Sequence, residues 1–235
     1  MAGKDGTETD RLTGIERLDF AVGFSFVAEG MVDVDAIAGV ASLEHADLAT
    51  FAEIYIAYFD RAPDALGLFY WGTRLADGMG LEEIAASFFV QPETVALYPD
   101  AADNAALVDA VYRNLLDREA DAAGRAYWID ALASGDVSRP EFMLAVINGA
   151  KAATGDPADA KVVQDKGRIG LDYAVVHGLT DIDNAARAMQ AYDRAAPQES
   201  LARIDDLIAG YRDGAMASDE IVVALAGVAD DPLHA

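Results

Sequence analysis

The stretch DREADAAGRAYW, residues 117–128, has a near-copy, DRAPDALGLFYW, fifty-seven positions earlier at residues 60–71. Each copy holds one of the two tryptophans of the 235-residue chain. In front of each dodecamer, apolar residues recur at i, i+3, i+4 and i+7, which predicts one buried face of a helix. These residues are Phe51, Ile54, Tyr55 and Tyr58 in the first copy, and Val108, Val111, Tyr112 and Leu115 in the second.

The dodecamer itself predicts a turn followed by a second helix. Asp64 and Asp121 stand directly before helical sequence, where an aspartate can cap the first free backbone amides. Gly67 and Gly124 fall in the first turn of that helix, so we expect another backbone to approach closely there. Each tryptophan precedes a leucine by four residues, which places both on one side of the helix and favours the core. We therefore predict a repeat of helix, acidic turn, tryptophan helix, glycine turn and helix.

Only one segment has the period of a strand. In residues 15–28, every second position is apolar (Leu18, Phe20, Val22, Phe24 and Phe26), which predicts a half-buried strand or a hairpin bent near Gly23. The predicted fold is mostly α, a helical repeat bundle with a short N-terminal β-hairpin or strand. We expect three parts: a strand or hairpin with a lead-in helix at 1–47, two helical repeats at 48–152 (48–99 and 105–152), and a C-terminal helical subdomain at 153–235.

Composition excludes several classes of function. The formal net charge is -24, with 41 acidic and 17 basic residues, so binding to nucleic acid is not expected. No apolar run approaches the roughly 20 residues of a membrane-spanning helix. The chain has no cysteine, which rules out disulfides and thiolate metal sites. The first residues, MAGKDGTETD, lack the order of a secretory signal peptide. We therefore expect a cytosolic protein, export without such a signal, or a place in a particle assembled inside a cell.

The repeated turns suggest two kinds of site, each with a structural alternative. Carboxylates in the turns are candidate calcium ligands, but calcium takes six to eight oxygens, and helix capping is the favoured interpretation. Tyrosines beside the tryptophans are candidates for stacking on sugars, with an arginine nearby. The candidate calcium ligands are Asp60, Asp64, Asp117 and Asp121, and the candidate glycan-binding residues are Tyr70, Tyr127 and Arg125.

Signals for catalysis are absent. No P-loop, G-x-G-x-x-G or G-x-S-x-G motif occurs, and the three histidines have no metal-ligand spacing. The many acidic residues could form a glycosidase pair, but a carboxylate separation is a property of the folded chain. We therefore expect no enzymatic activity.

The dodecamers resemble the repeats of the DUF4214 family, which typically read R-x-P-D-x-x-G-L-x-Y-W. The second copy departs from that pattern at Ala120 and Arg125, and the resemblance extends over about residues 11–195. The first copy matches at Asp60, Arg61, Pro63, Asp64, Gly67, Leu68, Tyr70 and Trp71, and the second at Arg118, Asp121, Gly124, Tyr127 and Trp128.

The resemblance implies association with a bacterial surface. Family modules occur in S-layer proteins, adhesins and calcium-rich exported proteins, and in S-layer relatives a helical region binds lipopolysaccharide with the help of calcium. The leading hypothesis is a non-catalytic attachment module that binds a lipopolysaccharide or capsule glycan, or docks a larger surface or virion structure. The alternative is an adaptor subunit of a phage-like tail, spike or S-layer, pairing through Phe20, Phe24 and Phe26. A homo-oligomer and a glycan-cleaving enzyme are further alternatives.

Overall fold

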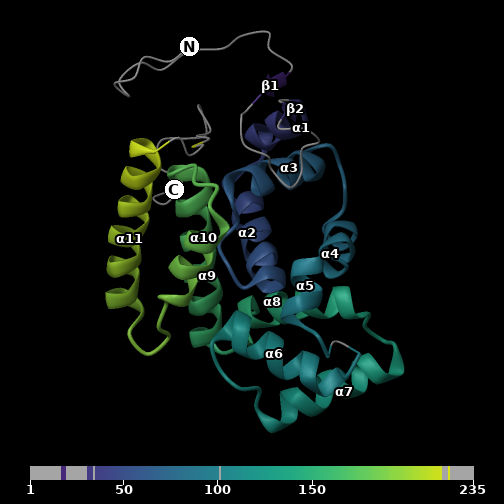
Figure 1. Cartoon of the computed structure of the whole chain (residues 1–235). Helices are drawn as coiled ribbons and strands as arrows, with labels where there is room; N and C mark the ends of the chain where they lie inside the picture. Colours follow the sequence, from purple (N-terminus) through teal and green to yellow (C-terminus); the bar gives the residue numbers. More distant parts are fainter. Residues whose placement is uncertain (1–16, 20–30, 34, 101, 219–221, 223–235) are drawn as a thin grey trace.

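The computed structural model describes residues 17–19, 31–33, 35–100, 102–218 and 222, and these are mostly helical, as predicted (Figure 1). The helices are α1 (Asp35–Ala38), α2 (His45–Phe59), α3 (Ala65–Ala76), α4 (Leu81–Phe89), α5 (Pro92–Leu97), α6 (Asn104–Leu116), α7 (Ala122–Ser134), α8 (Arg139–Lys151), α9 (Pro157–Leu171), α10 (Ile182–Gln190) and α11 (Pro197–Ala217), with a 3-10 turn η2 (Gly39–Ser42) and a π-helical turn η3 (Asp172–Val176).

The repeat is visible as two three-helix sets, α2–α3–α4 and α6–α7–α8, with the short α5 between them (Figure 1). The first residue of each dodecamer ends the first helix of its set. Asp60 and Asp117 have φ angles of 48° and 54°, which is the left-handed conformation. Glycine, asparagine and aspartate adopt this conformation more readily than other residues do. The aspartate that opens the dodecamer is thus a helix stop in both copies.

Helix α2 is buried on all sides rather than on the one predicted face. Every residue from Phe51 to Phe59 is buried, including Glu53. The cause is α9, whose glycines let it pack closely against the first repeat. A Cβ atom at Gly167 would lie 3.2 Å from Cγ of Glu53, and one at Gly170 would lie 3.0 Å from Cδ of Pro63. The C-terminal helices therefore share a core with the first repeat.

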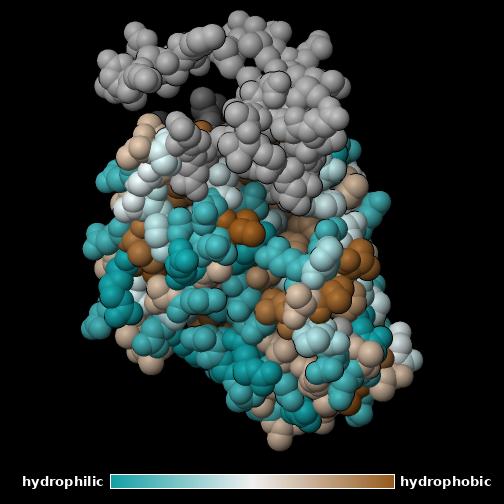
Figure 2. Space-filling view, viewed as in Figure 1, coloured by the Kyte–Doolittle hydropathy of each residue, from teal (hydrophilic) through white to brown (hydrophobic). Residues whose placement is uncertain are grey.

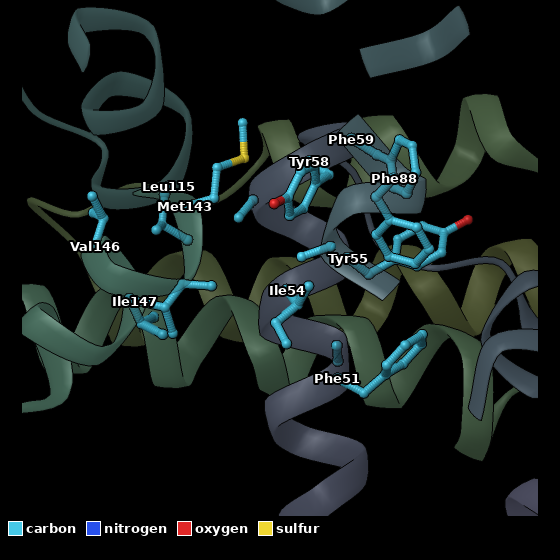
Figure 3. Packing of buried hydrophobic residues seen from close by; sticks show 14 of the residues in the cluster. Phe51, Ile54, Tyr55, Tyr58, Phe59, Phe88, Leu115, Met143, Val146 and Ile147 are labelled. Carbon is cyan, nitrogen blue, oxygen red and sulfur yellow. The ribbon is translucent and has the colours of Figure 1, made fainter. Parts of the chain in front are cut away.

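The main core surrounds the aromatic residues of α2. Figure 3 shows the rings of Tyr55 and Phe59 gathered beside Phe88 of α4, with Met143 and Val146 of α8 farther along the cluster. A second cluster joins α9, α10 and α11, and it includes Ile56 and Ala62 of the first repeat.

Two three-residue strands lie ahead of the helices. β1 (Arg17–Asp19) and β2 (Met31–Asp33) are antiparallel, with Leu18 opposite Val32. The rest of the alternating segment, including Phe20, Phe24 and Phe26, lies outside the described residues. The predicted hairpin near Gly23 is therefore not confirmed.

The face seen in Figure 2 is mostly hydrophilic, with small separate hydrophobic patches. Among the described residues, no helix combines the length and the apolar character needed to cross a membrane.

Candidate functional site

Both predicted helix caps are present. In the first copy, the carboxylate of Asp64 accepts a hydrogen bond of 2.7 Å from the backbone amide of Gly67. In the second, Asp121 accepts one of 2.8 Å from the amide of Gly124, its exact counterpart in the repeat. The capping role predicted for these two aspartates is confirmed, and it explains why an aspartate stands at this position in each dodecamer.

The turn of the first copy is a buried polar network. Arg61, which is 6% exposed, donates hydrogen bonds to the hydroxyl of Tyr55 at 3.1 Å and to the carboxylate of Glu93 at 2.6 and 3.1 Å. The hydroxyl of Tyr55 in turn donates to Asp64 at 3.0 Å. Burial, followed by the charge of Asp64, raises the pKa of Tyr55 well above its ordinary value. Arg61, Tyr55 and Asp64 are buried, and Glu93 closes the network at the surface with a side chain that is 42% exposed.

The turn of the second copy uses the same residue types with different partners. Arg118 donates to the buried carboxylate of Asp159 in α9 at 2.9 and 2.5 Å, and Arg194 donates to the same carboxylate at 2.7 Å. Burial opposes ionisation of Asp159, but the hydrogen bonds from both arginines lower its pKa. Tyr112 is the counterpart of Tyr55, whose hydroxyl donates to Asp64. The hydroxyl of Tyr112 instead accepts a hydrogen bond of 3.1 Å from the indole of Trp128.

The glycine of the dodecamer makes room for side chains. A Cβ atom at Gly67 would lie 2.7 Å from Oδ2 of Asp64 and 2.9 Å from the hydroxyl of Tyr55. At Gly124, the corresponding distances to Asp121 and Tyr112 are both 3.2 Å. The expectation of a close backbone is therefore wrong, since the nearest atoms at both glycines belong to the cap carboxylate and the tyrosine hydroxyl.

These distances predict unequal effects of one substitution in the two copies. We expect Gly67→Ala to lower the free energy of unfolding by about 1–3 kcal/mol, because the added methyl displaces two buried polar groups. Gly124→Ala should change it by less than about 1 kcal/mol, because a smaller displacement is offset by the better helix propensity of alanine. Urea unfolding of both variants measures the difference, and equal losses would contradict this account of the glycine.

The structure does not bring the four aspartates proposed as calcium ligands together into one cluster. Both oxygens of Asp64 already accept hydrogen bonds from the protein. Burial raises the pKa of Asp60 to about 6, although the charge of Lys166 opposes this. Within the described ranges, no group of three or more histidine, cysteine, aspartate or glutamate side chains could hold a metal ion.

The two tyrosines proposed for sugar stacking differ in exposure. The guanidinium carbon of Arg74 lies 3.7 Å from the ring centroid of Tyr70, one helical turn away, so a cation covers that ring. The equivalent position beside Tyr127 is Ala131, and the side chain of Tyr127 is 63% exposed. Of the two rings, Tyr127 is the one available to a ligand.

The tryptophans are packing anchors. Trp71 meets Phe88 edge-on, with ring centroids 5.1 Å apart, and Trp128 meets Phe142 in the same way at 5.2 Å. Trp128 also supports the exposed ring of Tyr127 from the side, at a centroid distance of 4.9 Å. The exposed tyrosine is thus held by a fixed neighbour.

Arg125, the third candidate glycan-binding residue, already has a partner. Its guanidinium donates to both carboxylate oxygens of Asp109, at 2.7 and 2.8 Å. This two-point ion pair ties α7 to α6 and leaves Arg125 half-exposed on the same helix as Tyr127.

A groove that the helical periodicity did not indicate is lined by residues of α2, α8, α9 and α11. It has a volume of about 750 Å³. Its walls combine small apolar residues with paired charges, and they consist of His45, Ala49, Glu53, Lys151, Pro157, Ala160, Lys161, Gln164, Asp165, Gly167, Arg168, Leu171 and Leu201.

Two carboxylates in this groove are nearly inaccessible to solvent and carry lysine partners. Lys151 donates to Glu53 at 2.6 Å, and Lys161 donates to Asp165, which also accepts from the hydroxyl of Tyr192 at 2.9 Å. Burial raises the pKa of Glu53 despite the hydrogen bond from Lys151. A signal was present in the sequence, because two of the four lysines of this acidic chain are Lys151 and Lys161.

Comparison with known proteins supports the family resemblance. Residues 85–154 match the family model of DUF4214, described as a domain of unknown function. This confirms the predicted resemblance to that family, over a shorter part of the chain than the expected residues 11–195. The match runs from within α4 to just beyond α8 and so contains the whole second dodecamer. No curated protein and no solved structure matches the chain.

Proposed function

We propose that this protein is a non-catalytic attachment module that binds a polysaccharide of a bacterial surface, with the ring of Tyr127 as the stacking platform. One observation carries the proposal: the second repeat exposes this ring, whereas Arg74 covers its counterpart in the first. The repeats would then share a folding role and differ in binding, with the second copy as the ligand-binding one.

The surroundings of Tyr127 suit a sugar. An aromatic face contacts the apolar C–H side of a pyranose, while polar groups beside it bind the hydroxyls. Asp130, three residues further along α7 and exposed, offers carboxylate oxygens on the same side of the helix. Because Trp128 supports the tyrosine ring from the side, little conformational freedom is lost when a ligand binds.

Substitution of the tyrosine tests this proposal. We expect Tyr127→Ala to weaken binding to polysaccharide extracted from the envelope of the producing bacterium by about tenfold, the equivalent of one lost aromatic contact. Tyr127→Phe should bind like the unaltered protein, since it keeps the ring. Isothermal titration calorimetry measures both affinities.

A matched control is Ile182→Ala, which removes an exposed apolar side chain from α10 and should leave the affinity unchanged. Undiminished binding by Tyr127→Ala would refute the platform. If the unaltered protein does not bind, the search turns to a protein partner, as the adaptor hypothesis requires.

A glycan-cleaving enzyme is the second candidate, because Glu53 and Asp165 line one groove and burial raises the pKa of Glu53. Glycosidases use such a pair, with one carboxyl protonated. Here, however, both oxygens of Asp165 accept hydrogen bonds from protein groups, and Lys151 stabilises the ionised form of Glu53. We therefore expect no release of reducing ends when the protein is incubated with the polysaccharide. Release of reducing ends by the unaltered protein but not by Glu53→Gln would favour the glycan-cleaving enzyme over the attachment module.

A further inference from the structure

We propose that the groove between α2, α9 and α11 is a second binding site, separate from Tyr127, for a ligand that carries carboxylate or phosphate groups. The proposal stands on the charges that line the groove and on how the fold holds them. It does not depend on glycan binding at α7.

The groove is far less acidic than the chain as a whole. The whole protein has 17 basic and 41 acidic residues, but the lining has three basic and two acidic side chains. A lining of this composition repels an anion less than a surface with the average charge of the chain does. The basic side chains are Lys151, Lys161 and Arg168, and the acidic ones are Glu53 and Asp165.

The buried carboxylates position the ammonium groups at the wall. The side chains of Glu53 and Asp165 are 6% and 4% exposed, whereas those of Lys151 and Lys161 are 40% and 53% exposed. Each lysine therefore reaches from solvent to a fixed acceptor. An ammonium group has three N–H donors, and each of these pairs uses one. The remaining donors are available to oxygen atoms of a ligand in the groove.

Arg168 adds a third cation with spare donors. One of its terminal nitrogens donates to both carboxylate oxygens of Asp205, each at 2.9 Å. A guanidinium has five N–H donors, so others remain for a ligand. The exposed amide of Gln164, also in the lining, can donate and accept.

Charge rather than stacking would give the selectivity. The lining residues, all within the described part of the chain, include no phenylalanine, tyrosine or tryptophan. The apolar lining residues are few and aliphatic, so a neutral sugar has no aromatic ring to stack on. An anionic group, in contrast, can accept charge-assisted hydrogen bonds from the basic side chains. The groove depends on the close packing of α2 and α9, which the missing side chain of Gly167 permits beside Glu53.

The test compares one polymer with and without its charge. Oligogalacturonate and its methyl ester share a backbone, and inorganic phosphate represents a free anion. Each is titrated into the full chain by calorimetry in a low-salt buffer without phosphate. We expect oligogalacturonate to bind, the ester to bind at least about tenfold more weakly, and affinity to fall as salt is added.

Variants locate the site. Lys161→Gln should weaken oligogalacturonate binding by about tenfold, and Lys161→Arg should largely restore it. Gln164→Trp fills the groove without a change of charge and should also weaken binding. Arg187→Gln removes one exposed positive charge from α10 and should have no effect. Thermal unfolding verifies that each variant is folded.

The outcomes separate the sources of the anion. If phosphate binds as tightly as oligogalacturonate and competes with it, the ligand is a small free anion. If oligogalacturonate binds much more tightly than phosphate, the ligand is an acidic polymer. The proposal is overturned if acid and ester bind equally, if neither oligogalacturonate nor phosphate binds, or if Lys161→Gln in a folded protein binds like the unaltered chain.

Discussion

Lys166→Met is expected to lower the free energy of unfolding by about 3 kcal/mol at pH 8, because it removes a buried cation that offsets the charges of Asp60 and Asp117 and leaves the carbonyl of Asn114 without this donor. Lys166 is 5% exposed, and its ammonium group donates to the backbone carbonyl of Asn114 at 2.5 Å. Burial lowers its pKa, while the charges of Asp60 and Asp117 raise it. These aspartates end α2 and α6 at equivalent positions, so one cation in α9 links the two repeats.

The loss should depend on pH with a definite sign. The pKa of Asp60 is about 6 in the folded protein, above its value of 3.8 in a model peptide. The folded state therefore holds a proton that the unfolded chain releases, and stability falls as the pH rises from about 4 to about 6. Without Lys166, the pKa of Asp60 in the folded protein rises further, so the decrease in stability with rising pH extends to higher pH. The variant should thus lose more stability at pH 8 than at pH 5.

Urea unfolding at the two pH values, with a second substitution, isolates this interaction. Asp60→Asn removes the carboxylate and keeps a residue that tolerates the left-handed conformation. In the Asp60→Asn background, Lys166→Met should lower the free energy of unfolding by less than it does in the unaltered protein. This decrease should also vary less with pH. A loss below about 1 kcal/mol at pH 8 would mean that Lys166 is an ordinary surface lysine.

Phe88→Ala is expected to destabilise the protein by about 3–5 kcal/mol, the range for removing a large side chain from a well-packed core. Phe88 is 0% exposed, and its ring contacts the aromatic residues of α2, beside which Figure 3 shows it, as well as Trp71 of α3. Five aromatic rings surround it with centroids 5.0–6.0 Å away, those of Phe51, Tyr55, Tyr58, Phe59 and Trp71.

The neighbouring Phe89 provides the control. It is half-buried at the edge of the same cluster, so Phe89→Ala should cost clearly less. Guanidinium unfolding followed by circular dichroism gives both values. Equal losses would show that the cluster around Phe88 is not the centre of the core.

The local features of the repeat could be predicted from sequence, because they depend on residues close in the chain. Asp64 and Asp121 cap the helices that follow them, as their position before helical sequence indicated. The asymmetry between Tyr70 and Tyr127 was also readable, since Arg74 and Ala131 stand at equivalent places in the two copies. Comparison of the copies position by position would have revealed it.

The long-range features were not predictable from periodicity. Nothing near Arg61 indicates that Glu93 is its partner, or that α9 covers the second face of α2. Glu53 and Asp165, which line the same groove, are 112 positions apart in the chain. A helical period identifies a face to be buried, but it does not identify the helix that buries it.

The central claim is that this protein attaches to a surface polysaccharide, and one binding curve tests it most directly. The full chain is titrated with envelope polysaccharide from the producing bacterium, first with calcium and then with EDTA. The account predicts saturable binding that is equal in both conditions, since it assigns binding to the ring of Tyr127 and helix capping to Asp64 and Asp121. The absence of binding by the folded protein would contradict it.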